Sequence, residues 1–139
     1  MIEKTFAIIK PGAVSDKVTG KIISMIEDAG FDILEMQKIM MSEEEAQALY
    51  AEHKEKPFFG EMVSSMTSSP VIVMMLSKEN AIAAWRDLMG ATNPANAAEG
   101  TIRKLYGKSI GSNATHGSDS AASAARELDI FFGGCCGTC

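Results

Sequence analysis

The stretch VIVMML, residues 71–76, is an unbroken apolar run that begins directly after a Ser-Ser-Pro turn. A short apolar run bounded by turn residues predicts a buried strand. A second run, TFAIIK at residues 5–10, has the same character and stops at Pro11 and Gly12. The segment FDILEMQKIM, residues 31–40, also has strand character. The three segments together predict a sheet.

Two helices flank the segment 31–40. The first is predicted at about residues 19–29, where apolar residues recur at helical spacing before Gly30, a residue type that commonly ends a helix in the left-handed conformation. The second opens at a capping box formed by Ser42 and Glu45. One face of this helix carries Ala46, Leu49, Tyr50 and His53.

Further helical segments follow along the chain. Residues 58–66 suit a short helix, and residues 79–89 suit a longer one that buries Trp85 and leaves Arg86 off its apolar stripe. Residues 101–107 suit one or two helical turns. The last helix is expected to bury a stripe formed by Ala121, Ala124, Ala125, Leu128, Phe131 and Phe132.

The alternation of strands and helices predicts one domain that covers residues 1–139. A chain of 139 residues can bury one core but is too short for two domains, and the sequence contains no internal repeat and no dividing linker. The order of elements suggests an α/β or α+β sandwich in which helices cover a sheet. The pattern alone leaves parallel and antiparallel strand pairing open.

The composition argues against several classes of protein. The net charge of −5 argues against a dedicated nucleic-acid-binding protein, because such binding rests on a broad basic face. The N-terminal segment lacks the basic flank and apolar core of a secretion signal. No stretch reaches the roughly 18 apolar residues of a membrane span. A soluble, cytoplasmic protein is therefore expected, with no membrane contact.

Two motif-like segments fail on inspection. YGKS, residues 106–109, resembles the end of a P-loop, but Ile102 stands where that motif requires glycine. The C-terminal GGCCGTC contains Cys136 and Cys139 at the spacing of a zinc or redox pair. Tetrahedral zinc requires four ligands, and the chain has 3 cysteines with no histidine nearby. Residues 133–139 are therefore expected to form a loose tail rather than a zinc site, and a redox role of the cysteines remains open.

The chain has 2 histidines, and the context of one of them suggests chemistry. His53 lies among charged residues in YAEHKEKP, where a surface or boundary position is expected. His116 lies in SNATHGSDS, residues 112–120, and Glu127 follows in the last predicted helix. A neutral imidazole is a competent nucleophile near pH 7, and a carboxylate on its far nitrogen would fix its tautomer. A structural histidine in a loop remains open on this pattern alone.

Four separated motifs resemble the nucleoside diphosphate kinase family. NATHGSDS (113–120) resembles the active-site signature of that family, and TFAIIKPGAV (5–14) resembles its N-terminal strand and loop. YAEHKEKPFF (50–59) resembles its nucleotide-binding helical hairpin, and RDLMGATNPANAAEGTIR (86–103) resembles the segment before its catalytic strand. The motifs occur in the right order over almost the whole chain. The resemblance implies an α+β sandwich of ferredoxin-like βαββαβ topology, with a four-stranded antiparallel sheet covered by helices.

The resemblance also implies an activity and the residues that carry it. Family members transfer the γ-phosphoryl group of a nucleoside triphosphate, typically ATP, to a nucleoside diphosphate by a ping-pong mechanism. His116 would be the nucleophile and would form a phosphohistidine on Nδ1, while Glu127 and Ser118 would orient its ring. Lys10 and Tyr50 would lie near the reacting phosphate. The nucleotide phosphates and sugar would be surrounded by Lys10, Tyr50, Arg86, Thr92, Arg103 and Asn113.

The resemblance further implies how the base and the metal are held. Phe58 and Ile110 would sandwich the base and Met62 would pad its pocket, so broad tolerance of the base is expected. Mg²⁺ would enter with the nucleotide and be held mainly by the phosphates, with no metal ligands expected in the protein. Members of the family form homo-oligomers. Because the chain ends soon after DIFFGG (129–134), both a tetramer and a hexamer remain open.

Two alternatives to the enzyme were weighed. A scaffold or regulatory protein of the same fold would bind nucleotide with little catalysis, and loss of His116, Lys10 or Arg103 would favour it. All three residues are present. A histidine phosphotransfer module would be a helical bundle, which the two apolar strands oppose. Gly12 stands where acidic residues or asparagine are more usual in the family, and little effect on the chemistry is expected.

Overall fold

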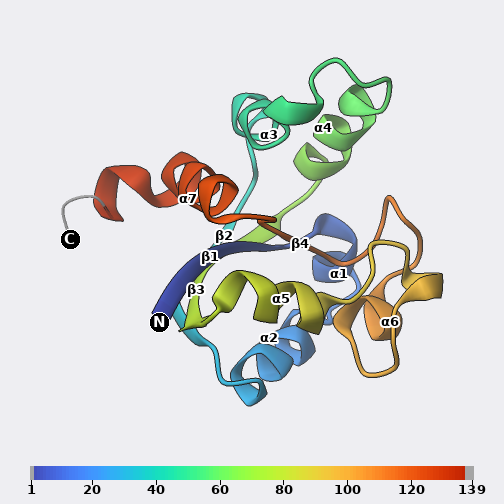
Figure 1. The fold of residues 1–139 in the computed structure, drawn as a ribbon. Helices are drawn as coiled ribbons and strands as arrows, with labels where there is room; N and C mark the ends of the chain where they lie inside the picture. Colours follow the sequence, from blue (N-terminus) through green and yellow to red (C-terminus); the bar gives the residue numbers. More distant parts are fainter. Residues whose placement is uncertain (1, 137–139) are drawn as a thin grey trace.

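The chain folds around a four-stranded antiparallel sheet (Figure 1). The computed structural model describes residues 2–136, with side chains as far as Phe132. The strands are β1 (Ile2–Ile9), β2 (Asp32–Ile39), β3 (Val71–Glu79) and β4 (Thr115–Gly117). Their order is β2-β3-β1-β4, and every pairing in it is antiparallel. This arrangement confirms the ferredoxin-like topology and resolves the pairing direction that the sequence pattern left open.

Helices cover both faces of this sheet (Figure 1). Relative to a plain βαββαβ chain, one helical hairpin is inserted between β2 and β3, and a second helical segment is inserted between α5 and β4. In chain order the helices are α1 (Pro11–Ser15), α2 (Thr19–Asp28), α3 (Glu43–Leu49), η1 (Ala51–His53), α4 (Phe59–Thr67), α5 (Ala81–Met89), η2 (Pro94–Asn96), α6 (Ile102–Tyr106) and α7 (Ala121–Cys136).

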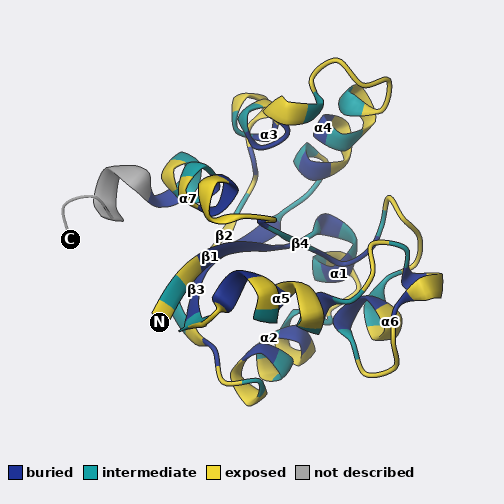
Figure 2. Ribbon diagram, viewed as in Figure 1, coloured by how far each residue is buried: buried dark blue, intermediate teal, exposed yellow. Residues whose placement is uncertain are grey.

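Each of the two central strands contains an unbroken apolar run, at residues 6–9 of β1 and 71–76 of β3, because both faces are buried there (Figure 2). In β1, Phe6 and Ile8 pack on one face, whereas Ala7 and Ile9 pack on the other. Successive side chains of a strand point to opposite faces, so an unbroken apolar run results when helices cover both. The same alternation in β3 places Val71, Val73 and Met75 on the first face and Ile72, Met74 and Leu76 on the second.

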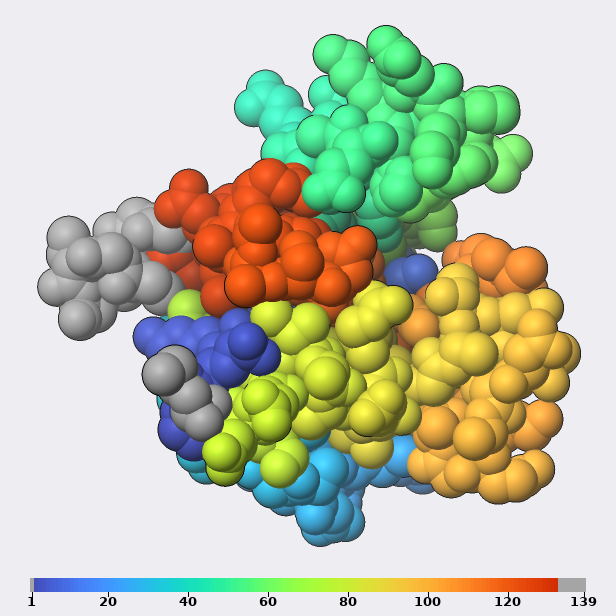
Figure 3. Space-filling model, in the orientation of Figure 1, coloured from blue at the N-terminus to red at the C-terminus, as the bar shows by residue number. Residues whose placement is uncertain are grey.

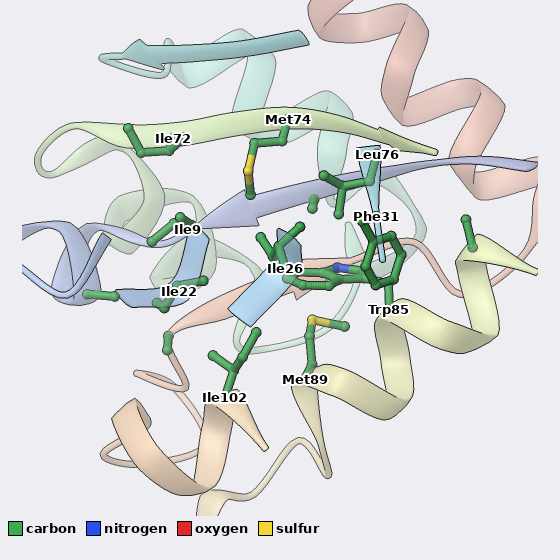
Figure 4. Close-up of a cluster of buried hydrophobic side chains, with 14 residues drawn as sticks. Ile9, Ile22, Ile26, Phe31, Ile72, Met74, Leu76, Trp85, Met89 and Ile102 are labelled. Atoms are coloured by element: carbon green, nitrogen blue, oxygen red, sulfur yellow. The ribbon is translucent and has the colours of Figure 1, made fainter. Parts of the chain in front are cut away.

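The core on one face lies between the sheet and the helices α2, α5 and α6 (Figure 4). Trp85 of α5 is fully buried there, and its ring meets Phe31 edge to face with the centroids 6.1 Å apart. Ile22 and Ile26 of α2 and Ile102 of α6 are also fully buried. Each such side chain contributes about 1.5–3 kcal/mol by leaving water. This core fixes α5 and α6, which carry part of the site.

The core on the other face lies under α7, α3 and α4. Phe131 of α7 stacks on Phe6 with the ring centroids 5.0 Å apart. The sequence prediction for α7 was partly wrong, because Ala121 and Ala125 are exposed. The buried positions of the helix include Ser123 and Glu127. Polar residues occupy this face because they form hydrogen bonds near β4, which a count of apolar residues does not detect.

Three boundaries differ from the sequence prediction. Pro11 begins α1 instead of only ending β1, because proline is well suited to the first turn of a helix. The helix that opens at Ser42 ends at Leu49, so Tyr50 and His53 lie beyond it. Strand β4 was read as part of a loop, because 3 residues are too few to show an alternating pattern.

The C-terminal helix is longer than the sequence suggested. α7 continues to Cys136, so residues 133–136 are helical where a loose tail was expected, and glycine in a helix lowers stability without forbidding the structure. The expectation for residues 137–139, including Cys139, lies outside the described residues. Within residues 2–136, no helix has both the length and the apolarity needed to cross a membrane.

Candidate active site

A cavity of about 700 Å³ opens between the α3–α4 hairpin and the segments around α5, α6 and β4. The space-filling view shows the hollow between the α3–α4 hairpin (green) and the α5–α6 region (yellow to orange) (Figure 3). Its volume lies within the range of small-molecule sites. The lining includes Lys10, Tyr50, Phe58, Met62, Arg86, Thr92, Arg103, Ile110, Asn113, His116 and Glu127. Half of the 22 lining residues are therefore ones that the sequence analysis named as site residues.

A tight turn leads the chain into β4 and positions His116. The amide of Thr115 donates to the carbonyl of Asn113 at 2.9 Å, which closes a γ-turn at Ala114. Ala114 has φ of 75°, a region that residues other than glycine rarely adopt. The carbonyl of Ala114 accepts from the amide of Lys10 at 2.8 Å. The turn thus joins the end of β1 to the start of β4 and brings Lys10 close to Asn113.

The pairing of β4 with β1 sets the direction of the His116 side chain. His116 is paired with Ile8, whose side chain packs toward α7. Paired residues of antiparallel strands share a face, so His116 also faces α7. Trp85 Nε1 donates to the His116 carbonyl at 3.3 Å from the opposite face. A side chain at Gly117 would collide with the Trp85 ring, so only glycine fits next to His116 here.

One carboxylate oxygen holds both the histidine and a neighbouring serine. His116 Nε2 lies 3.0 Å from Glu127 Oε1, and Ser118 Oγ donates to the same oxygen at 2.9 Å. Glu127 is 4% exposed, and its helix begins after Ser120, whose Oγ accepts from the amide of Ser123 at 3.1 Å. With the proton on Nε2 and directed at Glu127, Nδ1 carries the free lone pair.

Two aromatic rings confine the His116 ring. Tyr50 and Phe6 meet it edge to face, with centroid separations of 5.9 Å and 6.3 Å. Burial raises the pKa of the Tyr50 hydroxyl well above its usual value, and the negative charge of Glu127 adds to the effect. Tyr50 therefore keeps its proton at physiological pH and can donate a hydrogen bond into the cavity.

Four cationic side chains line the cavity: Lys10, Arg86, Arg103 and Arg126. Arg103 is 9% exposed and donates from Nη1 to the carbonyl of Gly90 at 3.0 Å and from Nη2 to the carbonyl of Thr115 at 2.9 Å. Its buried Nε has no partner among the described residues. Burial, with a smaller effect of Arg86, lowers the pKa of Arg103 to about 10, so the guanidinium stays charged at neutral pH.

Lys10 is held in place by Asn113. Its Nζ donates to Asn113 Oδ1 at 2.7 Å, and Asn113 Nδ2 donates to the carbonyl of Thr92 at 3.1 Å. Burial, with a smaller effect of the nearby charge of Arg103, lowers the pKa of Lys10 to about 8. Lys10, Arg86 and Arg103 thus present positive charge to the cavity, whose lining also carries the carboxylates of Glu52, Glu61, Asp119 and Glu127.

The outer end of the cavity is apolar and open. Phe58 is 44% exposed and Ile110 is 60% exposed, and Met62 lines the wall behind them. Phe58 and Met62 belong to the hairpin, which starts at the predicted capping box: Ser42 Oγ accepts from the Glu45 amide at 3.0 Å. Exposed apolar side chains on two walls of a cavity can hold a flat ring between them.

One site residue expected from the sequence lies outside the cavity lining, and several lining residues were not expected. Ser118 does not line the cavity but contacts Glu127 from behind. His53 is half-buried, as a boundary residue should be, but its ring also lines the cavity 6.0 Å from Phe58. Arg126 and Glu52 line it as well. The signal for His53 was its spacing of three residues from Tyr50, which a helical turn places on the same side.

Comparisons with known proteins agree with this geometry. The family model described as "Nucleoside diphosphate kinase" matches residues 3–135. A protein of that name from Geotalea uraniireducens is 57% identical over 131 residues, covering 94% of this chain and 96% of its own. One from Trichlorobacter lovleyi is 58% identical over 131 residues, covering 94% and 95%.

Solved structures give the same result. The nucleoside diphosphate kinase of Aquifex aeolicus superposes with a TM-score of 0.93 at 36% identity, over 95% of this chain and 96% of that one. A halophilic nucleoside diphosphate kinase from Halobacterium salinarum, solved in complex with CDP, gives a TM-score of 0.92 at 40% identity, over 95% and 88%. The fold and the site define a nucleotide-dependent phosphotransferase. The chain belongs to the nucleoside diphosphate kinase family.

Proposed function

We propose that the chain transfers the γ-phosphoryl group of a nucleoside triphosphate to a nucleoside diphosphate through a phosphohistidine at His116. The observation that carries this proposal is the contact of His116 Nε2 with the buried Glu127, which leaves Nδ1 as the ring nitrogen with a lone pair in a cationic cavity. Nδ1 attacks the γ-phosphorus, and the bond from phosphorus to the bridging oxygen breaks with release of the diphosphate. A terminal phosphate oxygen of a second diphosphate then attacks and breaks the phosphorus–nitrogen bond.

The neighbouring residues have distinct roles in this reaction. The imidazole becomes positively charged when Nδ1 is phosphorylated, and Glu127 stabilises that charge while Ser118 holds the carboxylate. Lys10, Arg86 and Arg103 offset the negative charge on the transferring phosphoryl group, because phosphoryl transfer depends mainly on positioning and electrostatic stabilisation. Tyr50 donates to the reacting phosphate, and Thr92 and Asn113 contact the phosphates and the sugar.

Mg²⁺ is the cofactor that accompanies the nucleotide in this proposal. The cavity suits a metal that is carried by the phosphates, because Lys10, Arg86 and Arg103 can contact phosphate oxygens. When bound, Mg²⁺ would neutralise phosphate charge and fix the phosphate conformation. The protein's own residues orient the phosphates and the nucleophile.

The proposed partners are nucleoside di- and triphosphates and further copies of this chain. The cavity provides an apolar slot for a base and a cationic end for phosphates. A homo-oligomer in the cytoplasm, either a tetramer or a hexamer, is proposed for the assembly. The edge strand β2 exposes Leu34 and Met36, with 45% and 48% of their surfaces accessible, which suits burial against another copy. Light scattering after size-exclusion chromatography distinguishes the two oligomers.

A non-catalytic scaffold that only binds nucleotide is the competing function. It would bind nucleotides without taking up phosphate. The contact between His116 and Glu127 opposes it, because nucleotide binding alone does not require a histidine fixed by a buried carboxylate.

The decisive experiment is phosphorylation of the protein by ATP labelled at the γ position, with no acceptor present. We expect stoichiometric label that is acid-labile and alkali-stable, as a phosphoramidate is, and that unlabelled GDP discharges. Absence of label in a protein that binds ATP would favour the scaffold. An acid-stable, alkali-labile adduct would instead place the phosphate on a serine such as Ser118 or Ser120.

A further inference from the structure

Arg126 is a pocket residue that the mechanism above does not use. It lies on α7 next to Glu127 and lines the cavity. Its Nη1 donates to the carbonyl oxygen of Ala48 at 2.7 Å. Its Nη2 lies 3.4 Å from Glu52 Oε1 and 3.5 Å from Glu127 Oε2. One guanidinium group therefore contacts both the carboxylate that holds His116 and the inserted hairpin.

The contact with Glu127 supports a carboxylate that is almost removed from water. The Glu127 side chain is 6% exposed, and its Oε1 already accepts from His116 and Ser118. A buried carboxylate is stable when it is paired and when its oxygens have polar partners. Arg126 supplies positive charge at Oε2, the oxygen that His116 does not use. The carboxylate is thereby fixed at both of its oxygens.

The contacts with the hairpin support the wall that carries the base-binding residues. The carbonyl of Ala48 lies in the last turn of α3, where helix carbonyls lack partners within the helix. Arg126 provides that partner with its shortest hydrogen bond. Tyr50 follows two residues later, and Glu52 lies in η1 before Phe58. The position of α7 is thus linked to the position of the hairpin.

We propose that Arg126 is a positioning residue that aligns the Glu127–His116 pair and the α3–α4 hairpin at the same time. This role of Arg126 rests on the proposed function, in which the Glu127–His116 pair carries out the phosphoryl transfer. Because planar guanidinium donors point in fixed directions, one arginine can contact a carbonyl and two carboxylates together, which a lysine ammonium cannot reproduce at the same distances. One side chain therefore fixes the position of His116 relative to the hairpin that carries the base-binding residues.

Two substitutions separate the two contacts. Arg126→Gln keeps a neutral donor for the Ala48 carbonyl but removes the charge beside Glu127. We expect phosphorylation by saturating ATP to slow by about 10- to 100-fold, the range found when partners that orient a functional histidine are removed. The KM for nucleotide should stay within twofold. Arg126→Ala should slow phosphorylation by the same factor. It should also raise the KM by at least fivefold, because the hairpin loses its hydrogen bond from Arg126 to the Ala48 carbonyl.

Chemical rescue and a matched control exclude a general loss of structure. Guanidinium chloride at millimolar concentration should restore a large part of the phosphorylation rate of Arg126→Ala, whereas sodium chloride at equal ionic strength should not. Arg126→Lys should recover less than half of the lost rate. Lys21→Ala, which removes an exposed cation from α2 on the other face of the sheet, should behave as the parent protein.

The ring nitrogens of His116 give a test that does not depend on turnover. With ¹⁵N-labelled histidine, of which the chain has 2, the nucleotide-free parent should show His116 with its proton on Nε2. Arg126→Ala should mix the two tautomers or charge the ring. If the parent takes no phosphate from ATP while this change occurs, the proposed function fails and the positioning role stands. If the parent is phosphorylated and Arg126→Ala changes neither the tautomer nor the rate by twofold, the positioning role is wrong.

Discussion

The two ends of the cavity are built in opposite ways. At the inner end, Lys10, Asn113 and Glu127 are fixed by hydrogen bonds of 2.7–3.1 Å. At the outer end, Phe58 and Ile110 are exposed and apolar. Hydrogen bonds and charges discriminate strongly between ligands, whereas apolar contact discriminates weakly. The difference predicts a site that is selective for phosphates and permissive toward the base they carry.

The two histidines mark these two ends and should give the largest contrast. His116→Ala removes the nucleophile, so we expect loss of both phosphoenzyme and transfer, by at least about 10⁴-fold in kcat, as for nucleophiles in covalent mechanisms. His53→Ala removes only a ring beside Phe58 and should leave the phosphoenzyme fully formed, with kcat within about tenfold. Quench-flow with labelled ATP measures both. Equal losses of phosphoenzyme and kcat in the two variants would contradict the separate roles of His116 and His53.

Glu127→Gln tests how much of the inner end depends on charge. The amide keeps the shape and one acceptor oxygen but cannot stabilise the positive ring of the phosphohistidine. We expect transfer to slow by about 100-fold, with the phosphoenzyme still detectable, because the nucleophile remains. Single-turnover phosphorylation gives the rate. Ser118→Ala provides the comparison. Its phosphorylation rate should fall less than that of Glu127→Gln, since the contact of His116 with Glu127 is retained. A Glu127→Gln rate equal to that of the parent would assign the orientation of His116 to other residues.

Lys10 predicts an alkaline limit to activity. Its pKa is lowered to about 8 by burial and by Arg103, so the free protein loses this cation as the pH rises through 8. The unphosphorylated protein reacts with ATP in the proposed mechanism. Because the charged form of Lys10 holds phosphate, kcat/KM for ATP should be constant at neutral pH and fall about tenfold per pH unit above 8. Bound phosphate favours the charged form, so kcat should fall at higher pH than kcat/KM. Adenine does not titrate in this range and is the suitable base.

Lys10→Arg supplies the control for this pH dependence. Arginine remains charged throughout the range, so the alkaline fall should disappear even if the absolute rate is lower. A parent profile that stays flat to pH 10, or a variant profile that falls as the parent does, would show that another group sets the alkaline limit.

Phe58→Ala should have the smallest effect and sharpens the description of the outer end. Loss of one stacking surface should raise the KM for ADP, GDP and CDP by roughly 5- to 100-fold, in line with about 1–3 kcal/mol per stacked base. The increases in KM for ADP, GDP and CDP should agree with one another within about fivefold, and kcat should change less than KM. Leu105→Ala, an exposed apolar position on α6 that does not line the cavity, is the matched control. A loss confined to one base would mean that the site reads the base edge.

The sequence predicted the fold and most of the site through two different signals. The strands β1 and β3 were visible because residues 6–9 and 71–76 are buried on both faces of the sheet and therefore form unbroken apolar runs. The site residues were visible because Lys10, Arg86, Arg103 and His116 lie in motifs whose order resembles a family, which the comparisons confirm.

The missed features depend on contacts between distant parts of the chain. β4 is short and polar, and it is a strand only because β1 lies beside it. Arg126 looks like a solvated helix residue until α7 packs beside Ala48, which is 78 positions earlier in the chain. No local pattern contains that information. The roles assigned to the individual site residues remain predictions for the experiments above.

The collision between Gly117 and Trp85 has a consequence for how this sequence can change over evolutionary time. Any side chain at position 117 meets the indole, and a smaller residue at position 85 would leave a hole in the main core. Neither position can therefore change first without a loss of stability. Random libraries at 117 should return glycine alone, whereas a joint library at 117 and 85 should return compensated pairs, because residues in contact do not act independently. The glycine next to His116 is thus expected to be inherited together with a tryptophan on the far side of the sheet.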